Sequence, residues 1–252
     1  MKNVLIVGYG VVGHNLAKEL EKLKPDIYDK FKTENNTKRD IVYDYAFICV
    51  DTPFNDKGDC DISAVIDALN ETKAKVIIIK STILPKTTKM LQERFKDCKI
   101  LFSPEYYGGT QHCNNFEFAF TIIGGDKEYG RQVVQLLQNV YDARHRFFLT
   151  DSTTAELVKY MENSYLATKV SFCIQFFEMA KELGVNYEEL RELFIQDVRV
   201  NPSHTFVYED HPYWDTHCLN KDVPAIANYM DAPFLKSVID FNKNQKLKYK
   251  KD

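Results

Sequence analysis

Three glycines near the amino terminus have the spacing of a turn that can hold a pyrophosphate. They form GYGVVG between an apolar strand pattern, VLIV, and a helical pattern, HNLAKELEKL. Residues without side chains let a phosphate approach the backbone, and the following helix turns its amino end toward the negative charge. The spacing alone is a weak signal, but its place between a strand and a helix strengthens it. We therefore expect a dinucleotide to contact Gly8, Gly10, Val11, Val12 and Gly13.

An aspartate stands at the end of the next short strand pattern. DIYD ends at Asp29, where a carboxylate would accept hydrogen bonds from the ribose hydroxyls of adenosine. The same carboxylate would repel a 2′-phosphate, so the expected cofactor is NAD rather than NADP. The alternative is an ordinary strand, turn and helix with an exposed aspartate.

Polar residues follow three later strand patterns. These segments are Asp51-Thr52-Pro53, Lys80-Ser81-Thr82 and Ser103-Pro104-Glu105. Ligands of parallel sheets bind at the carboxyl ends of the strands. We therefore expect the cofactor to be lined by Val50, Thr52, Thr82 and Glu105. Turn chemistry alone is the alternative for each of the three segments.

Residues 152–184 form a long helix pattern. Thr153 and Glu156 have the spacing of a capping box, no glycine or proline interrupts the pattern, and Gly184 supplies a left-handed stop. At a rise of about 1.5 Å per residue the helix is roughly 45 Å long, which is longer than a small domain is wide. We expect it to join two domains.

Two polar residues stand out in the apolar pattern of this helix. Lys159 and Asn163 are one turn apart on one face. A solvated face with an ordinary lysine is the alternative to a functional pair. After Val170 apolar residues cover most of the circumference, which indicates burial on several sides. We therefore expect a homodimer through the 152–184 helix.

Strand and helix patterns alternate up to residue 150. The strands expected after Asp29 are AFICV, KVIIIKST, KILFSPE, FTIIGG and RFFLT. Wholly apolar strands separated by helices predict a mostly parallel sheet that is covered on both faces. The expected fold class is α/β: a Rossmann-type, mostly parallel sheet followed by a long spine helix and a small α-helical domain. The expected domains are an NAD-binding domain at 1–150, a helical central domain at 151–240 and a frayed basic tail at 241–252.

The composition argues against several function classes. The 33 basic and 36 acidic residues give a net charge of -3, and KNKNQKLKYKKD is the only basic cluster, so we expect neither a nucleic-acid nor a membrane partner. MKNVLIVG begins a strand at once, without a signal peptide, so a cytoplasmic protein is expected. The cysteines show no metal-ligand spacing, so we expect free thiols and no metal. They are Cys49, Cys60, Cys98, Cys113, Cys173 and Cys218.

Eight local motifs occur in the order in which one known family carries them. They are GYGVVG with Asp29, CVDTP, KSTILP, SPEYYGGT, IIGG, TAELVKYMENSYLA, DVR and CLNKD. Over residues 1 to about 230 the sequence therefore resembles the UDP-glucose and GDP-mannose dehydrogenase family. The resemblance implies that the primary alcohol of a nucleotide sugar such as UDP-glucose is oxidised to a carboxylate. Two NAD molecules are reduced in that reaction, and the aldehyde is not released.

The resemblance also implies roles for single residues. Cys218 in CLNKD corresponds to the nucleophile that forms a thiohemiacetal and then a thioester. Asp222 corresponds to the carboxylate that orients or deprotonates the hydrolytic water, whereas the neighbouring Lys221 is expected to be structural. Lys159 and Asn163 correspond to the ammonium and amide groups that stabilise the alkoxide and the tetrahedral oxyanions.

Further roles follow from the other motifs. Glu105 corresponds to the family's acid/base carboxylate, and Thr82 to a hydroxyl that positions a water or the nicotinamide. Arg199 in DVR corresponds to an arginine that contacts the sugar, often from the neighbouring subunit. The residues expected to bind the substrate are Glu105, Tyr106, Tyr107, Lys159, Asn163, Arg199 and Cys218.

Two departures from the family pattern bear on the substrate. The family has a glycine-rich loop before the cysteine, whereas this sequence has HPYWDTHC, with Tyr213, Trp214 and His217 in place of small residues. Bulky residues do not allow the same close approach of the backbone to a sugar. The family also has a second Rossmann-like domain that grips the nucleotide, and the sequence ends before it. We expect a short form of the family that lacks this domain.

Two other functions remain open on the sequence. One is a two-electron NAD-dependent dehydrogenase for a small hydroxyacid, because related enzymes carry Lys and Asn one turn apart on a long helix but have no catalytic thiol. The other is a non-catalytic remnant that binds NAD or a partner, which would be favoured if Tyr213 and Trp214 filled the sugar pocket. Replacing Cys218 by alanine would discriminate the first, because a two-electron enzyme should keep most of its turnover. The presence of Glu105, Lys159, Asn163, Cys218 and Asp222 together argues against the second.

Overall fold

The computed structural model describes residues 2–54, 60–107 and 118–250. The chain forms two compact units, Met1–Lys159 and Tyr160–Asp252. The boundary between them lies within a helix, nine residues after the boundary expected at 150.

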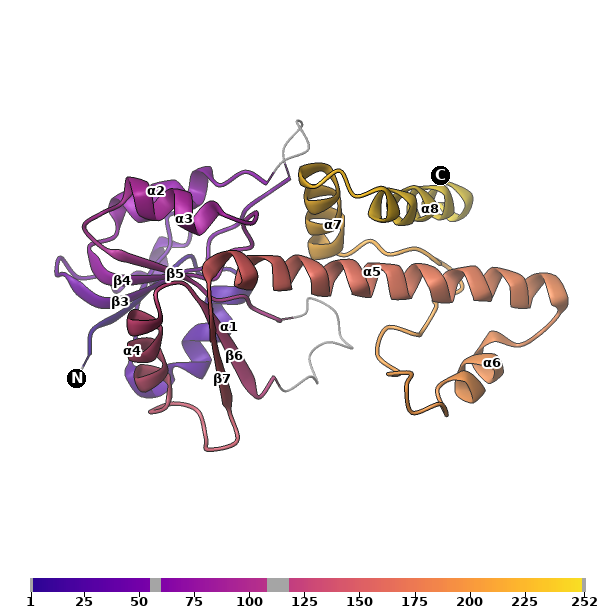
Figure 1. Cartoon of the computed structure of the whole chain (residues 1–252), viewed down its shortest axis with the longest axis horizontal. Helices are drawn as coiled ribbons and strands as arrows, with labels where there is room; N and C mark the ends of the chain where they lie inside the picture. Colours follow the sequence, from indigo (N-terminus) through magenta and orange to yellow (C-terminus); the bar gives the residue numbers. More distant parts are fainter. Residues whose placement is uncertain (1, 55–59, 108–117, 251–252) are drawn as a thin grey trace. The chain divides into compact units, whose positions relative to one another are not determined.

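One sheet forms the centre of the first unit (Figure 1). Within the described residues it has seven strands in the order β2-β1-β3-β4-β5-β6-β7. Neighbouring strands are parallel except for β5 and β6, which are antiparallel. The strands are β1 (Val4–Val7), β2 (Asp26–Tyr28), β3 (Tyr43–Ile48), β4 (Ala74–Ile79), β5 (Lys99–Phe102), β6 (Phe120–Gly124) and β7 (Arg146–Thr150). The expected mostly parallel, Rossmann-type sheet is confirmed.

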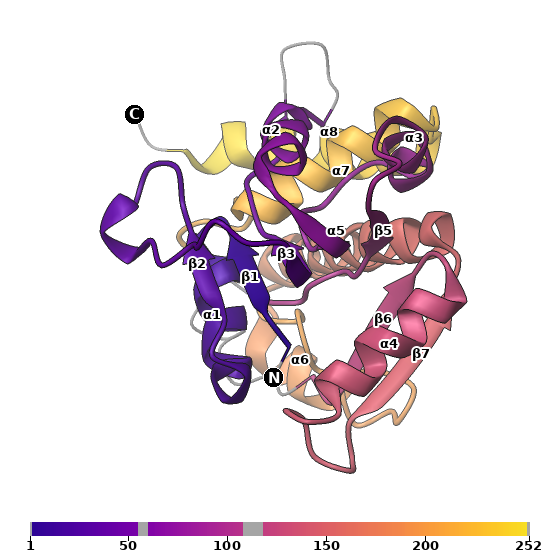
Figure 2. The ribbon, with the colours of Figure 1, turned by 90° about the vertical axis from the view of Figure 1, so that its left-hand side faces the viewer.

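Helices cover both faces of this sheet. Figures 1 and 2 show α2 and α3 on one face and α1 and α4 on the other. Successive side chains of a strand point to opposite faces, so Leu5 and Val7 pack with the α2 and α3 side, while Val4 and Ile6 pack with the α1 and α4 side. Burial on both faces is the reason why the central strands β1, β3, β4 and β5 are largely apolar. The helices of this unit are α1 (Val11–Glu19), α2 (Ser63–Glu71), α3 (Thr87–Arg94), α4 (Lys127–Leu137) and the short 3-10 helices η1 (Glu21–Leu23) and η2 (Thr33–Asn35).

The strands end earlier than their apolar patterns predicted. β4 ends at Ile79 and β5 at Phe102, so the segments Lys80–Thr82 and Ser103–Glu105 lie in the loops after the strands. The helix expected from Pro85 begins at Thr87, after Lys86 in a left-handed conformation (φ 76°). The loops after β4 and β5 therefore carry the polar residues at the carboxyl edge of the sheet.

The long helix α5 (Ser152–Leu183) begins differently from the prediction. Asp151 accepts hydrogen bonds from the backbone N–H of Thr154 at 3.1 Å and from its hydroxyl at 2.5 Å, whereas the buried hydroxyl of Thr153 has no partner. Glu156 instead accepts hydrogen bonds from the backbone of residues outside α5. The predicted capping box was wrong, because the aspartate before the helix caps it.

The end of α5 agrees with the prediction. Gly184 has a left-handed backbone (φ 68°), and the N–H of Val185 donates to the carbonyl of Ala180 at 2.8 Å. This six-residue closure satisfies a carbonyl at the helix end and is a common way for a glycine to stop a helix.

The second unit is helical. After the carboxyl part of α5 it contains α6 (Tyr187–Phe194), α7 (His217–Tyr229) and α8 (Pro233–Tyr249). Its core joins α5, α7 and α8 and is formed by Ala167, Trp214, Leu219, Val223, Ala227, Val238 and Ile239. A small helical unit after the long helix is confirmed.

The expected frayed tail was wrong as far as the structure describes it. Helix α8 continues to Tyr249, and buried Asn242 exchanges two hydrogen bonds with the backbone of Trp214, at 2.8 and 2.9 Å. The Lys248 ammonium and the Tyr249 hydroxyl both bond to Glu178 on α5. The lysines up to Lys248 therefore belong to a packed helix rather than to a free basic segment. Among the described residues, none of the helices has both the length and the apolarity needed to cross a membrane.

Candidate functional site

The glycine turn follows β1 and leads into α1. A Cβ on Gly8 (φ 91°) would lie 2.7 Å from the carbonyl oxygen of Cys49, and one on Gly13 would lie 1.8 Å from the carbonyl oxygen of Gly8. Gly10 has open space in front of it and is the N-cap of α1, which has no side-chain cap. The backbone N–H groups of Val11 and the residues after it thus face an open surface at a helix amino end. These features fit a bound pyrophosphate.

Asp29 is tied to this turn. Its carboxylate accepts hydrogen bonds from the N–H of Tyr9 at 2.6 Å and from those of Phe31 and Lys32 at 2.8 Å. Partial burial would raise the pKa of Asp29, but these donors and the charge of Lys32 lower it overall. The carboxylate is therefore held as an anion beside the glycine turn, where the expected ribose would lie.

The ends of β3 and β4 are joined through side chains. The hydroxyl of Thr52 donates to the carbonyl of Thr82 at 2.7 Å, and the hydroxyl of Ser81 donates to the carbonyl of Val50 at 2.6 Å. The thiol of Cys60 also lies 3.4 Å from the carbonyl oxygen of Thr82. The structure thus brings Val50, Thr52 and Thr82 together at the carboxyl edge of the sheet.

The segment after β5 contributes three predicted residues. Glu105 is buried and accepts a hydrogen bond from the N–H of Tyr107 at 2.9 Å. The ring of Tyr106 lies under the ammonium of buried Lys159, with 5.1 Å from Nζ to the ring centroid. Burial raises the pKa of the Tyr107 phenol, and the negative charge and hydrogen bond of Glu19 raise it further. Tyr107 is therefore directed to α1, while Tyr106 contacts the predicted lysine.

A second cluster lies in the helical unit around Asp222. This carboxylate is 1% exposed, and one oxygen accepts from the amide of Asn163 at 2.6 Å. The other oxygen accepts from the ammonium of Lys221 at 2.6 Å. Asn163 is 59 residues before Asp222 in the chain, so the folded unit joins two motifs that the sequence keeps apart.

Cys218 lies on the first turn of α7, one turn before Asp222. The hydroxyl of Thr216 caps this helix by accepting from the N–H of Leu219 at 3.4 Å. Residues four apart on a helix share a face. Cys218 is partly exposed at a helix amino end, which is an environment that favours thiolates. A thiol, a carboxylate and an amide with such placement can support nucleophilic attack on a carbonyl and later attack by water.

Arg199 has no contact in the described structure with either of these two clusters. Its side chain is 86% exposed, and its guanidinium pairs with Asp197 at 2.5 Å. The described structure thus gives no contact between Arg199 and another predicted site residue.

The aromatic residues before Cys218 have contacts within the second unit. Trp214 is 5% exposed and belongs to the core of the second unit, where its indole N–H donates to the hydroxyl of Ser171 at 3.0 Å. The Tyr213 ring lies near the ammonium of Lys246, 5.7 Å from the centroid, and His217 is exposed on α7. Trp214 therefore anchors the loop.

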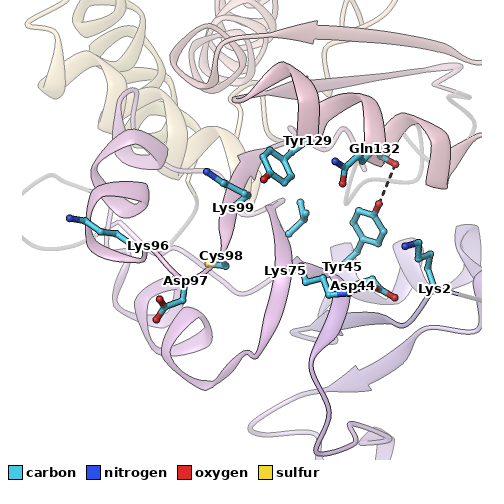
Figure 3. A pocket seen from close by; sticks show the side chains of 11 residues that line it. Lys2, Asp44, Tyr45, Lys75, Lys96, Asp97, Cys98, Lys99, Tyr129 and Gln132 are labelled. Atoms are coloured by element: carbon cyan, nitrogen blue, oxygen red, sulfur yellow. Dashed lines mark hydrogen bonds and ion pairs between the residues drawn. The ribbon is translucent and has the colours of Figure 1, made fainter.

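A hollow of about 330 Å³ lies elsewhere on the first unit (Figure 3). It is lined by residues at the amino ends of β3, β4 and β5, such as Asp44, Lys75 and Lys99, whereas the predicted residues lie at the carboxyl ends. Lys75 pairs with Asp44 at 2.9 Å, and Lys99 lies over the ring of Tyr129. None of the predicted site residues lines this hollow.

Three buried polar residues were not assigned a site role from the sequence. Lys80 and Glu156 each bond to backbone groups of another loop, and Lys221 pairs with Asp222. For Lys80, the sequence signal was the position of a charged residue directly after an apolar strand. In the part of the chain that the structure describes, no group of three or more His, Cys, Asp or Glu could hold a metal ion.

The parallel sheet, the glycine turn and Asp29 define the first unit as a Rossmann-type dinucleotide-binding domain. Residues 14–144 match the NAD binding domain of the UDP-glucose/GDP-mannose dehydrogenase family, and residues 153–244 match its central domain. The chain belongs to this family. An NAD-binding domain was expected from the sequence, and the match confirms it.

Relatives and solved structures agree with this assignment. The UDP-glucose 6-dehydrogenase of Rickettsia felis is 27% identical over 217 residues, which cover 79% of this chain and 47% of the relative. The chain spans about half the length of the curated relatives that it matches.

Two solved structures show the fold. A UDP-glucose dehydrogenase from Pyrobaculum islandicum has a TM-score of 0.79 at 20% identity. The matched part covers 97% of this chain and 68% of that chain. The 3-hydroxyisobutyrate dehydrogenase of Mycobacterium tuberculosis has a TM-score of 0.71 at 15% identity, with 99% of this chain and 95% of that chain covered. Both the sugar and the hydroxyacid enzymes thus share this fold.

Proposed function

We propose that the protein oxidises the C6 alcohol of a nucleotide sugar of the UDP-glucose type to a carboxylate, with NAD as the hydride acceptor and Cys218 as a covalent nucleophile. Family membership supports the reaction class. The observation that supports the proposal most is the hydrogen bond between Asn163 and Asp222, because Asp222 lies one turn after Cys218 on α7. An ordinary two-electron dehydrogenase has no use for the thiol.

In the first oxidation the residues of the sheet edge prepare the alcohol. Glu105 accepts the hydroxyl proton directly or through a water, and Lys159 stabilises the alkoxide oxygen with its positive charge. NAD, when bound, accepts the hydride from the alcohol carbon and leaves an aldehyde. Thr82 and Val50 line the edge of the sheet on which the nicotinamide would lie.

The thiol then carries the second oxidation. The Cys218 thiolate adds to the aldehyde carbon, the carbonyl oxygen takes up a proton, and a thiohemiacetal results. Loss of that proton to a base and of a hydride, which a second NAD would accept, gives a thioester. Water attacks the thioester carbon, the C–S bond breaks, and the carboxylate and the thiolate are released. Asn163 donates to the developing oxyanion through the amide proton that Asp222 does not use, and Asp222 orients the water.

A hydroxyacid dehydrogenase is the second candidate, because the fold of such an enzyme matches nearly the whole chain. Its two-electron reaction would use Lys159 and Asn163 but not Cys218. The two functions therefore differ in their dependence on the thiol and in the number of hydrides transferred.

The deciding measurement is the number of NADH molecules formed per substrate consumed, with nucleotide sugars and small hydroxyacids as substrates. We expect two NADH per nucleotide sugar for the unmodified protein and no carboxylate from Cys218→Ser. The control is Cys98→Ser, which should keep full turnover because Cys98 lies at the hollow of Figure 3. One NADH per hydroxyacid, with Cys218→Ala as active as the unmodified protein, would contradict the proposal. Binding of NAD without turnover of either substrate class would favour the remnant.

We also propose that α5 joins two copies of the chain. Large apolar side chains with exposed fractions of 41–77% lie three, four or seven residues apart along its second-unit part, as on one face of a helix. A continuous apolar face of this kind marks an interface. The face consists of Met161, Tyr165, Phe172, Phe176, Met179 and Leu183.

A further inference from the structure

Lys80 is a buried cation that the proposed reaction does not use. It directly follows β4 and is 9% exposed, in a position where the preceding residues are wholly apolar. Lysine is almost never buried without partners, because removing its charge from water costs several kcal/mol unless hydrogen bonds or counter-charges compensate. The contacts of Lys80 therefore show what the buried ammonium does.

The side chain of Lys80 crosses from the end of β4 to the segment after β5. Its ammonium donates to the carbonyl of Pro104 at 3.1 Å and to the hydroxyl of Ser103 at 3.3 Å. The backbone at both ends is already in the sheet ladder, since Lys80 N–H donates to Ile48 and Ser103 N–H donates to Ile79. The ammonium thus fastens the peptide that leads directly into Glu105.

We propose that Lys80 is a positioning residue, whose buried ammonium holds the Ser103–Pro104 turn and thereby places the Glu105 carboxylate at the carboxyl edge of the sheet. This inference rests on the proposed function in one respect, which is the catalytic role of Glu105. The turn leaves the sheet after Phe102, and Glu105 is the first charged residue beyond it. A shift of this peptide would move the carboxylate directly.

The charged surroundings of Lys80 agree with a role toward Glu105. Burial lowers the pKa of Lys80, the nearby Cys49, Glu105 and Glu19 raise it, and the charge of Lys159 lowers it. Cys49 is itself buried, which raises its pKa to about 12, so its thiol is neutral at pH 7. Glu105 and Glu19 are therefore the negative charges that face the ammonium, and Lys159 is the competing cation.

The hydrogen bonds and the charge of Lys80 give it a role that an apolar side chain of the same size could not fill. A methionine at position 80 would fill nearly the same space, but it would neither hold the Pro104 carbonyl nor attract a carboxylate. Without the ammonium, the carbonyl of Pro104 loses its buried donor, and the Glu105 carboxylate loses the fixed turn that places it.

The test is amide hydrogen exchange measured by NMR, because the N–H of Tyr107 is protected by its hydrogen bond to the Glu105 carboxylate. We expect Lys80→Met to speed exchange of the Tyr107 N–H by about tenfold or more, while the amides of the central strands β3 and β4 keep their rates. Lys80→Gln, which loses the charge and shortens the side chain, should speed it as well and covers the case in which Lys80→Met does not fold. The control Lys80→Arg keeps a cationic donor for Pro104 and should leave the rate nearly unchanged.

An unchanged Tyr107 rate in Lys80→Met or Lys80→Gln, or an equal acceleration of the strand amides, would overturn the proposal. The exchange measurement needs no substrate, so it separates this inference from the proposed function. Where the nucleotide sugar is turned over, kcat should fall in the variants that lose the protection. Faster Tyr107 exchange without any turnover would support the role of Lys80 and count against the proposed reaction.

Discussion

Cys218 and Asp29 show how a single side chain takes its chemistry from its position. The sulfur lies on the first turn of α7, where the partial positive charge of the helix end favours a thiolate. The carboxylate of Asp29 is kept ionised by three backbone donors next to the glycine turn. Both residues were predicted from motifs, and both lie at helix or turn positions that suit the predicted roles.

The first prediction concerns the reactivity of the thiols. We expect iodoacetamide at pH 8 to modify Cys218 more than about tenfold faster than Cys49 or Cys173. Burial raises the pKa of Cys49 to about 12 and also raises that of Cys173, so neither forms appreciable thiolate at pH 8. Mass spectrometry of peptides over time measures the three rates. Equal rates for Cys49 and Cys218 would remove the argument for a special thiol.

The second prediction concerns the cofactor. Replacing Asp29 by alanine should weaken NADH binding by about tenfold or more, because a charged acceptor for the ribose hydroxyls is lost, and should reduce discrimination against NADPH. Fluorescence titration of both cofactors gives the two dissociation constants. Asp29→Asn is the matched control, since it keeps one oxygen for the turn N–H groups, and its effect should be intermediate. Unchanged affinities for both cofactors would exclude Asp29 from the site.

At the scale of elements, Glu156 fastens α5 to α3. Its buried carboxylate accepts from the N–H of Lys86 and of Thr88, both at 2.7 Å, and so caps the amino end of α3 from another helix. Lys159 follows one turn later on α5. The same contact that caps α3 therefore fixes the part of α5 from which Lys159 projects.

The third prediction tests this contact. Glu156→Gln should lower the free energy of unfolding by roughly 1–3 kcal/mol, because one backbone N–H would face the amide N–H₂ instead of an oxygen. Urea unfolding followed by circular dichroism measures the change. The exposed Glu182 on the same helix provides the control, and Glu182→Gln should change stability by less than about 0.5 kcal/mol. Equal effects of the two substitutions would show that the cap contributes nothing of its own.

At the scale of the molecule, the two units divide the predicted residues between them. The first contains the residues predicted to bind the dinucleotide, together with Glu105 and Lys159, and the second contains Asn163, Cys218 and Asp222. Helix α5 runs through both and carries Lys159 and Asn163 one turn apart. The chain spans about half the length of its curated relatives, and the apolar face of α5 is the surface proposed to hold a second copy.

The fourth prediction concerns that face. The double substitution of Phe172 and Phe176 by glutamate should convert a dimer to a single chain, because four carboxylates would have to be buried at a symmetric contact. Light scattering after size-exclusion chromatography measures the mass. Leu247→Glu is the control, since Leu247 is 79% exposed on α8, outside the face, and should leave the mass unchanged. A single-chain mass for the unmodified protein would contradict the proposed dimer.

Features with local causes could be predicted from the order of residues alone. Apolar strand patterns predicted the sheet, the glycine spacing predicted the turn into α1, and Gly184 predicted the end of α5. In each case the residues that cause the feature are also the residues that form it. The order of the motifs was sufficient to predict the family, because the order and spacing of motifs can be read without the folded structure.

The partners of the buried polar groups could not be predicted in this way, because they depend on how distant segments pack. Glu156 was expected to cap its own helix and caps α3 instead, and Trp214, at a position where the family has a small residue, packs in a core and bonds to Asn242 on α8. Lys80 could be recognised as a buried cation only once Ser103 and Pro104 were placed beside it. A buried polar group must be satisfied by whichever backbone or side chain the packing brings near, and that neighbour can be seventy residues away in the chain.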